Sequence, residues 1–414
     1  MAKTGTFISV AEDQEGKNPR IVTPYFPLPV AMGDSPSIDA FARLRVSNPA
    51  TIFDSQLQYD KHPLLWDEWG DGTATHNANE SCVDMAVTSG QSIRRQTFQY
   101  HRYQPGKSQL IFCTGAFANC DTVRMVKRSS VTGSPIDTAI DQDKWNIDTL
   151  EEFDFEKSVI FYADIEYLGV GRVRTGIVPD GIPVVGNQFL HAGKESTTYM
   201  STANLPLRYE LVSNGVSTFK RMGYFDDENG IFLEAEVASA SSSMKHICST
   251  VMSEGGQSFE QAFIFSAETA LLTAGSVEAP LLAIRPKTLF NSMVNRGHIQ
   301  PMHYHLGVLT NDLVFRVYYD PVITGGAWVS ADANSITEYN VTATSFTGGI
   351  NTDSDYILGG KKSGGQSSSS NENSKFPITL DHAGANPKAM LLTAQRIGNA
   401  DSTVYASAQW REIR

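Results

Sequence analysis

Cysteine is scarce in this sequence, and the spacing of the few that occur argues against the usual cysteine chemistry. The chain has 414 residues and four cysteines, which are Cys82, Cys113, Cys120 and Cys248. None of them forms a Cys-x-x-Cys pair, so we expect no zinc site of that kind. Four scattered cysteines in a chain of this size are expected to be small buried hydrophobic residues. The protein is expected to be made in a reducing cytoplasm.

Positive charge and long apolar runs are also in short supply. The 33 Lys and Arg residues are outnumbered by 45 Asp and Glu residues, which gives a formal net charge of −12. A nucleic-acid binder needs a basic face that displaces phosphate counterions, and the basic clusters at Arg94-Arg95, Arg124 to Arg128 and Lys361-Lys362 are more typical of solvated strand faces. No stretch approaches the roughly 18 apolar residues of a membrane span, and Met1 to Val10 lacks the apolar segment of a signal peptide. We therefore expect no nucleic-acid partner and no membrane insertion.

The residue types that are plentiful favour β-sheet. The 33 Gly and 18 Pro residues are typical of many turns, and the 21 Phe, 15 Tyr and 5 Trp residues suit pleated, half-buried surfaces. From about residue 50, short apolar or alternating runs are separated by turn residues, which is typical of sandwiches or barrels. The length favours two or three domains. The sequence therefore predicts a mainly β fold with antiparallel, jelly-roll-like β-sandwich domains over residues 51–277 and 278–414, behind an extended N-terminal arm over residues 1–50.

The N-terminal arm is predicted from its prolines, since proline disfavours both helices and central strands. The prolines of this segment are Pro19, Pro24, Pro27, Pro29 and Pro36. A short apolar piece, Tyr25 to Val30, lies among them. Such an arm either docks on a neighbouring subunit or folds over its own domain, and the sequence favours neither.

Several segments predict individual elements. Asn229-Gly230 lies between two apolar runs, which indicates a β-hairpin with a type I′ turn. Val404, Ala406, Ala408 and Trp410 alternate with polar residues, which predicts a half-buried strand. The stretch Ser258 to Leu272 fits a short helix or a strand equally well. Gly359 to Ser374 is rich in Gly, Ser and Lys and is expected to be a long surface loop.

Candidate metal and phosphate sites are weak. Gly169-Val-Gly171 lacks the third glycine and the helix of a nucleotide-binding loop, so it indicates tight sheet packing or a bulge. His303 and His305 would share one face of a strand, with His298 and Asp320 nearby in sequence. A metal site needs a third ligand in fixed geometry, so a solvated strand face is the favoured interpretation. We expect no cofactor and no metal.

Three acidic clusters offer oxygen ligands of the kind that calcium prefers. They are Asp67 to Asp71, Asp141 to Asp148, and Asp226 to Asn229. None matches a spaced Asp-x-Asp-x-Asp-Gly loop with a distal Glu. The favoured interpretation of each cluster is therefore a turn fixed by side-chain hydrogen bonds and not a calcium site. The sequence also contains no Gly-x-Ser-x-Gly and no His-Glu-x-x-His. The protein is therefore predicted not to be an enzyme and to have no catalytic residues, although carboxylates that meet only after folding leave a tail-borne glycan hydrolase as an open alternative.

Several long strings resemble a family of uncharacterised virion proteins from tailed bacteriophages and related large viruses. The match runs from about residue 35 to the C-terminus, and the strings that carry it are Asp39 to Pro49, Thr51 to Ser55, Pro63 to Asp67, Arg95 to Ser108, Tyr167 to Arg174, Tyr199 to Tyr209, Ile247 to Val251 and Trp410 to Glu412. One segment departs from the family order. The segment resembling Lys220 to Gly230 follows a strand like Leu110 to Thr114 in the relatives, whereas here it follows Tyr209 to Val212. The resemblance therefore does not fix the strand order.

The resemblance implies a structural component of the virion that is synthesised in the host cytoplasm. We expect a tail-associated protein, as a fibre, baseplate or adaptor, with a capsid decoration or collar protein as the alternative. A glycan-binding module that recognises the host surface is a further alternative. The expected partners are other virion proteins and other copies of this chain, as a homo-oligomer such as a trimer. Host surface glycan would be a partner of the glycan-binding alternative.

Overall fold

The computed structural model describes residues 49–257, 262–359, 367–368 and 376–414. The arm predicted over residues 1–50 lies outside this part except for its last two residues, and most of the loop predicted over Gly359 to Ser374 lies outside it as well. The strand pairings of the described residues are antiparallel, and their helical segments are two 3-10 turns, η1 (Gln142–Lys144) and η2 (Pro179–Gly181). The prediction of a mainly β, antiparallel sandwich fold is confirmed.

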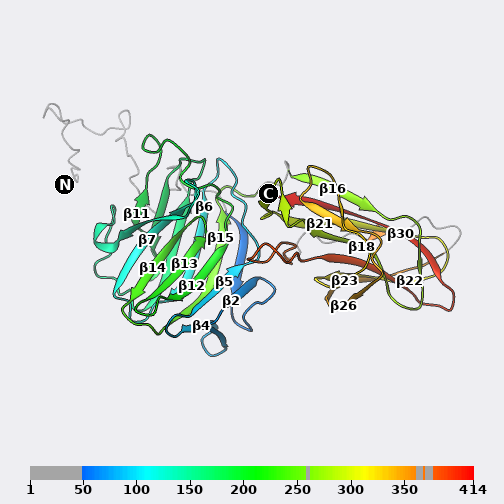
Figure 1. Ribbon diagram of the computed structural model, residues 1–414, viewed down its shortest axis with the longest axis horizontal. Coiled ribbons are helices and arrows are strands. Elements are labelled where there is room, and N and C mark those ends of the chain that lie inside the picture. The colour runs from blue at the N-terminus through cyan, green and yellow to red at the C-terminus, as the bar shows by residue number, and fades with distance from the viewer. Residues whose placement is uncertain (1–48, 258–261, 360–366, 369–375) are drawn as a thin grey trace, which may run out of the picture.

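The first sandwich consists of an eight-stranded and a seven-stranded sheet, seen at one end of the molecule in blue to green (Figure 1). The eight-stranded sheet has the order β11 (Val184–Phe189), β10 (Val173–Ile177), β9 (Ser158–Ile165), β6 (Gln109–Ala116), β15 (Ser242–Ser253), β4 (Cys82–Val87) and β3 (Thr73–Asn77), with β1 (Ala50–Gln56) also paired to β15. The seven-stranded sheet has the order β2 (Trp66–Gly70), β5 (Ser92–Thr97), β12 (Leu207–Ser213), β13 (Thr218–Phe225), β14 (Gly230–Val237), β7 (Thr122–Ser129) and β8 (Ile136–Asp141).

The second sandwich consists of a five-stranded and a six-stranded sheet, in yellow-green to red (Figure 1). The five-stranded sheet has the order β16 (Phe263–Glu268), β30 (Ser402–Ile413), β21 (His298–Val308) and β28 (Ser367–Ser368), with β17 (Leu272–Ala274) also paired to β30. The six-stranded sheet has the order β24 (Val329–Ser330), β25 (Thr337–Asn340), β18 (Ala279–Pro286), β29 (Met390–Arg396), β22 (Leu313–Tyr319) and β27 (Ile350–Ile357). Two short ribbons join β19 (Leu289–Phe290) to β20 (Met293–Val294) and β23 (Val322–Thr324) to β26 (Ser345–Thr347).

Each sandwich has its own hydrophobic core, built from the inward-facing residues of both sheets. In the first, Phe161 of the eight-stranded sheet and Leu233 of the seven-stranded sheet belong to one buried cluster. In the second, the cluster includes Phe315 and the fully buried Trp410. Full burial of one such side chain contributes roughly 1.5–3 kcal/mol, so these clusters are the main stabilising term of each sandwich.

The predicted C-terminal strand is confirmed, because Val404, Ala406, Ala408 and Trp410 are buried along β30. The open choice at Ser258 to Leu272 resolves as strand over Phe263–Glu268, which forms β16, while residues 258–261 lie outside the described part of the chain. Both β16 and β17 pair with β30, so the boundary expected at residue 278 falls inside the second sandwich. The chain leaves the first sandwich after β15, near Gly255-Gly256, where both glycines have positive φ.

The hairpin predicted around Asn229-Gly230 is present, but its turn type was wrong. Phe225 pairs with Gly230, so residues 226–229 form a four-residue turn instead of a two-residue type I′ turn. Asp226 determines this outcome, because its carboxylate accepts hydrogen bonds from the backbone N–H groups of Glu228 and Asn229 at 2.9 and 2.8 Å. Such a side-chain cap stabilises the longer turn.

The four cysteines are free thiols, and only part of the burial prediction holds. Cys82 and Cys113 are buried, whereas Cys120 and Cys248 are half-buried. Burial raises the pKa of Cys82 to about 11, with the carboxylate of Asp84 adding to the effect. Within the described residues, no helix has the length and apolar character needed to cross a membrane.

Candidate functional site

The two sandwiches meet at a small joint made of rings and charged groups. Trp69 of β2 stacks on His382 with ring centroids 3.8 Å apart and planes 3° from parallel. The carboxylate of Asp67, on the same strand, accepts a hydrogen bond from the backbone N–H of His382 at 2.9 Å and lies 2.7 Å from its Nδ1. These contacts are directional, so the joint fixes the orientation of one sandwich against the other.

Two cation–π contacts extend this joint. The Arg296 guanidinium lies 4.7 Å from the centroid of the Tyr100 ring, and the Lys388 ammonium lies 4.3 Å from that of Phe98. In both pairs the cation belongs to the second sandwich and the ring to the first. Arg296 also donates to the backbone carbonyl of His382 at 2.9 Å, which ties the cation to the loop that stacks on Trp69.

A cleft of about 600 Å³ opens beside this joint. Its wall on the first sandwich includes Tyr100 and the turn of residues 226–229, and its wall on the second includes residues 293–297 and His382. The walls combine carboxylates, amides, guanidinium groups and aromatic rings. A cleft of this size at a domain junction with a few convergent polar groups is typical of a ligand site.

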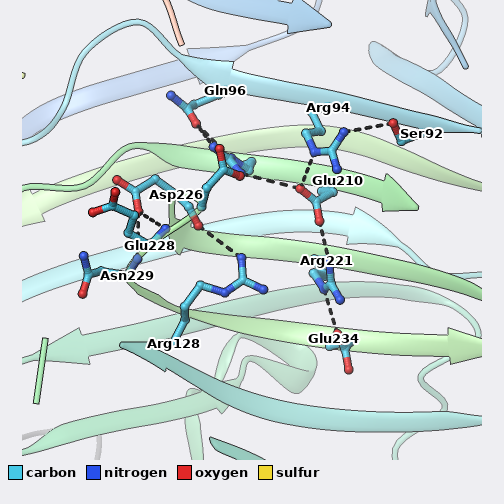
Figure 2. A network of polar contacts seen from close by, with 12 residues as sticks. Ser92, Arg94, Gln96, Arg128, Glu210, Arg221, Asp226, Glu228, Asn229 and Glu234 are labelled. Carbon is cyan, nitrogen blue, oxygen red and sulfur yellow. Dashed lines mark hydrogen bonds and ion pairs between the residues drawn. The ribbon is translucent and has the colours of Figure 1, made fainter. Parts of the chain in front are cut away.

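The acidic turn in this cleft is held by hydrogen bonds, as the turn interpretation of the sequence predicted. The amide of Asn229 is buried, donates to the Ser201 hydroxyl at 2.8 Å and accepts from the backbone N–H of Ser201 at 3.1 Å. Figure 2 shows Asp226, Glu228 and Asn229 close together at the end of the sheet. The turn therefore presents carboxylates in a fixed arrangement.

Arg208 of β12 lies behind this turn as a buried cation. Its guanidinium donates to the amide oxygen of Gln96 at 2.8 and 2.6 Å and to the carboxylate of Asp227 at 2.5 Å. Burial acts to raise the pKa of Asp227, and the Arg208 guanidinium more than offsets it, so this pKa lies below its ordinary value. Asp227 therefore carries its charge into the cleft at neutral pH.

A row of alternating charges crosses the seven-stranded sheet next to the cleft, and we call it the charge ladder; Figure 2 shows its members from Arg94 to Glu234. It consists of Arg94, Glu210, Arg221, Glu234 and Arg124, on five successive strands. Successive ion pairs measure 2.8, 2.6, 2.7 and 3.0 Å. The Glu210 side chain is only 3% exposed, so part of this row is buried in spite of its charge.

The other sequence candidates do not converge on one site. The rings of His303 and His305 lie 6.4 Å apart on β21, and Asp320 instead binds Lys388 at 2.8 Å. Across the described part of the chain, no group of three or more His, Cys, Asp or Glu side chains is placed to hold a metal ion. Asp141 pairs with Lys144 at 2.6 Å.

The charge ladder and the joint were missed by sequence reasoning. The register of five strands brings the members of the ladder together, and the joint brings Asp67 of β2 to a turn at His382, 315 positions later in the chain. Arg208 and Glu210, two residues apart within an apolar run, were the available signal. Charged residues in such a run are rarely buried unless they are paired.

Comparisons with known proteins identify no family. No family model and no curated protein matches the chain. Among solved structures, peanut lectin with a nine-residue peptide is 9% identical and covers 50% of this chain and 98% of its own, with a TM-score of 0.21. A legume lectin-like domain from Entamoeba histolytica is 11% identical and covers 50% of this chain and 98% of its own, with a TM-score of 0.19. The CBM2 module of the evolved Dit of Lactobacillus casei BL23 phage J-1 is 5% identical and covers 51% of this chain and 98% of its own, with a TM-score of 0.20. Scores this low carry no argument about function.

Proposed function

We propose that this protein is a structural component of a tailed-bacteriophage virion and that it assembles through subunit contacts. Its proposed place is the tail, as a fibre, baseplate or adaptor, with head decoration or a collar as the alternative. The resemblance of its long sequence strings supports the virion role. The proposal assigns no reaction to the protein, and release of oligosaccharides from host polysaccharide by the purified protein would overturn that part.

The observation that carries an assembly role is the open edge at β16. This strand ends the five-stranded sheet and pairs with β30 on one side, and no strand of the described chain pairs with its other side. Two of its apolar side chains, Phe263 and Ile264, are 54% and 52% exposed. An edge strand with exposed apolar residues is a template for pairing with another chain, and we assign this edge to a contact between copies in a homo-oligomer.

Purified particles test the virion role directly. Quantitative mass spectrometry of washed virions is expected to find the protein at a fixed copy number, and its absence from particles would contradict the proposal. Imaging of whole particles carrying a tagged copy then separates tail from head.

The edge contact is tested by the substitution Ile264→Lys, which places a charge on the open edge. We expect this variant to shift toward monomer in sedimentation and to be under-represented in particles. Val216→Lys is the matched control, because Val216 is 76% exposed in the first sandwich and away from this edge. Equal assembly of both variants and the parent would rule out β16 as the contact.

A second candidate function is recognition of host glycan, and the cleft between the sandwiches is the observation that favours it. Carboxylates and amides that accept hydrogen bonds from hydroxyl groups stand there beside aromatic rings. We expect saturable binding of host polysaccharide by the isolated protein, weakened by Glu228→Ala in the cleft and unchanged by Glu152→Ala outside it. Absence of saturable binding would eliminate this candidate.

A further inference from the structure

One wall of the cleft between the sandwiches exposes apolar side chains. This wall includes the hairpin of β19 and β20, on which Leu289, Met293 and Val294 are 55%, 67% and 44% exposed. Met293 and Val294 line the cleft together with Phe290. Apolar side chains that gather in this way beside a cleft mark an interaction surface. We call this element the apolar hairpin.

The apolar hairpin is held in place at its base. The buried side-chain amide of Asn295 donates to the backbone carbonyls of Lys287 and Ile336 at 2.9 and 3.1 Å. Val294 packs against Gly384, where an added Cβ atom would lie 2.5 Å from the Cγ1 of Val294. The backbone of the hairpin therefore loses little conformational entropy when a partner binds.

The opposite wall of the cleft is the acidic turn (Figure 2). The side chain of Asp227 is 79% exposed and Glu228 is exposed as well. Two of the cations that line the cleft are already neutralised by carboxylates, Arg208 by Asp227 and Arg414 by Glu412. The cleft therefore combines an apolar wall with a wall that accepts a cation.

An occupant that fits both walls carries a cation next to apolar side chains. A neutral polysaccharide carries no cation, whereas a protein segment with Lys or Arg beside apolar residues supplies both features. Residues 17–30 of the predicted arm, which lie outside the described part of the chain, have this composition, and we call them the arm segment. It contains two cations, no Asp or Glu, and six aliphatic or aromatic residues: Lys17 and Arg20, followed by Ile21, Val22, Tyr25, Phe26, Leu28 and Val30.

The prolines of the arm segment favour binding in a cleft. They are Pro19, Pro24, Pro27 and Pro29. Because proline fixes φ, such a segment loses less conformational entropy on binding than a chain without prolines. Docking of proline-bearing segments in grooves with aromatic side chains is an established mode of peptide recognition.

The chain that links the arm segment to the first sandwich is long enough to reach another copy. Ala50 pairs with Ser253, at the end of β15 from which the chain passes into the second sandwich. The arm therefore joins the described chain close to the joint. Residues 31–48 span at most about 60 Å when extended, which exceeds the roughly 40 Å width of an eight-stranded sheet.

We propose that the arm segment docks in the cleft of a neighbouring copy, with Arg20 against the acidic turn and the apolar residues that follow it against the apolar hairpin. This inference rests on the assembly role proposed above and adds a second contact between copies to that of β16. The docked segment touches both sandwiches, so it reinforces the orientation that the joint sets. It also fills the cleft, so host polysaccharide competes with it.

Disulfide trapping between two full-length variants tests the contact. One variant carries Thr23→Cys in the arm segment, and the other carries Met293→Cys on the apolar hairpin. Mild oxidation of the mixture is expected to give a covalent dimer that mass spectrometry identifies as a link between positions 23 and 293. Thr23→Cys mixed with Val216→Cys is the matched control, because Val216 is 76% exposed at the end of β12 and β13 away from the acidic turn. The parent protein, which has four native cysteines, sets the background.

Three outcomes would overturn the proposal. The first is an equal dimer yield from the two mixtures. The second is trapping only within a single chain that carries both Thr23→Cys and Met293→Cys. The third is saturable binding of host polysaccharide in the cleft without any trapping, which would assign the cleft to a glycan.

The copy number in washed virions separates this proposal from the assembly role. A protein that is present at fixed copy number but gives no link between positions 23 and 293 contradicts the docking alone. A protein that is absent from particles contradicts the assembly role and the docking together.

A charge exchange gives a second readout at exposed positions that leaves the core unchanged. Arg20→Glu places like charges against the acidic turn and is expected to lower the trapping yield about fivefold. Glu228→Arg in the copy that carries Met293→Cys is expected to restore the yield. Glu152→Arg, at an exposed position outside the cleft, is the matched control and is not expected to restore it. An unchanged yield with Arg20→Glu would refute the pairing of the arm segment with the acidic turn.

Discussion

The charge ladder gives a sharp prediction at Glu210, because this carboxylate is almost fully buried among cations. It lies 2.8 Å from Arg94, 2.6 Å from Arg221 and 3.6 Å from Arg208. The substitution Glu210→Gln keeps the shape of the side chain but removes its charge. Three guanidinium groups would then face one another without the anion between them.

The loss in the free energy of unfolding depends on whether the charge ladder behaves as a set of surface ion pairs or as a buried ion-pair network. An exposed pair contributes about 0–1 kcal/mol, whereas removing one partner of a buried pair costs about 3–5 kcal/mol. Glu210 is 3% exposed, while Arg94 and Arg221 are 24% and 17% exposed. We therefore expect Glu210→Gln to lower the free energy of unfolding by about 3 kcal/mol, at the lower end of the buried range.

Urea denaturation followed by intrinsic fluorescence measures this loss. Glu228→Gln is the matched control, because Glu228 is an exposed carboxylate in the neighbouring turn, and its effect is expected to stay within about 0.5 kcal/mol. The double variant with Arg221→Gln is expected to lose less than the sum of the single losses, since the two residues share one interaction. A loss below about 1 kcal/mol for Glu210→Gln would refute the buried-network reasoning.

The same residue predicts an acid dependence. Burial acts to raise the pKa of Glu210, but Arg221, Arg94 and Arg208 outweigh it, so the pKa in the folded protein lies below the ordinary value of 4.5. The stabilisation by the charged form is complete above pH 4.5 and is lost as the pH falls through the lower folded value. The parent is therefore expected to lose stability more steeply than Glu210→Gln as the solution is acidified below pH 4.5.

Three further predictions address the rest of the molecule. His382→Ala removes the stack on Trp69 and the side-chain contact with Asp67, so we expect about 2 kcal/mol less coupling between the sandwiches and a broader size distribution in small-angle X-ray scattering; an unchanged profile would contradict this. Trp410→Ala should cost about 3–5 kcal/mol in urea denaturation, whereas Tyr405→Ala on the exposed face of β30 should cost about 1 kcal/mol or less. Burial lowers the pKa of His101 to about 3, with the charge of His298 adding to the shift, and burial lowers the pKa of His298 to about 4. The neutral rings therefore stabilise the fold above pH 6.5 and lose this effect on acidification. The double variant His101→Gln with His298→Gln should flatten the dependence of the free energy of unfolding on pH between 6.5 and 4 by up to about 1.4 kcal/mol per pH unit and group.

Elements that are encoded by a short local pattern of residues could be predicted from the sequence. The alternation from Val404 to Trp410 identified β30, because apolar residues at every second position are the pattern of a half-buried strand. The Asn229-Gly230 pair located a hairpin but gave the wrong turn. The side chain of Asp226 accepts a hydrogen bond from the backbone N–H of Asn229 and stabilises a four-residue turn. This hydrogen bond outweighs the preference of Asn-Gly for a two-residue type I′ turn.

Features that depend on strand register, or on contacts between distant segments of the chain, were not predictable from one sequence. The charge ladder joins Arg94 to Glu210 across 116 positions of the chain. The joint brings Asp67 to His382 across 315 positions. The boundary near residue 278 failed because β16 and β17 pair with a strand more than 125 residues later.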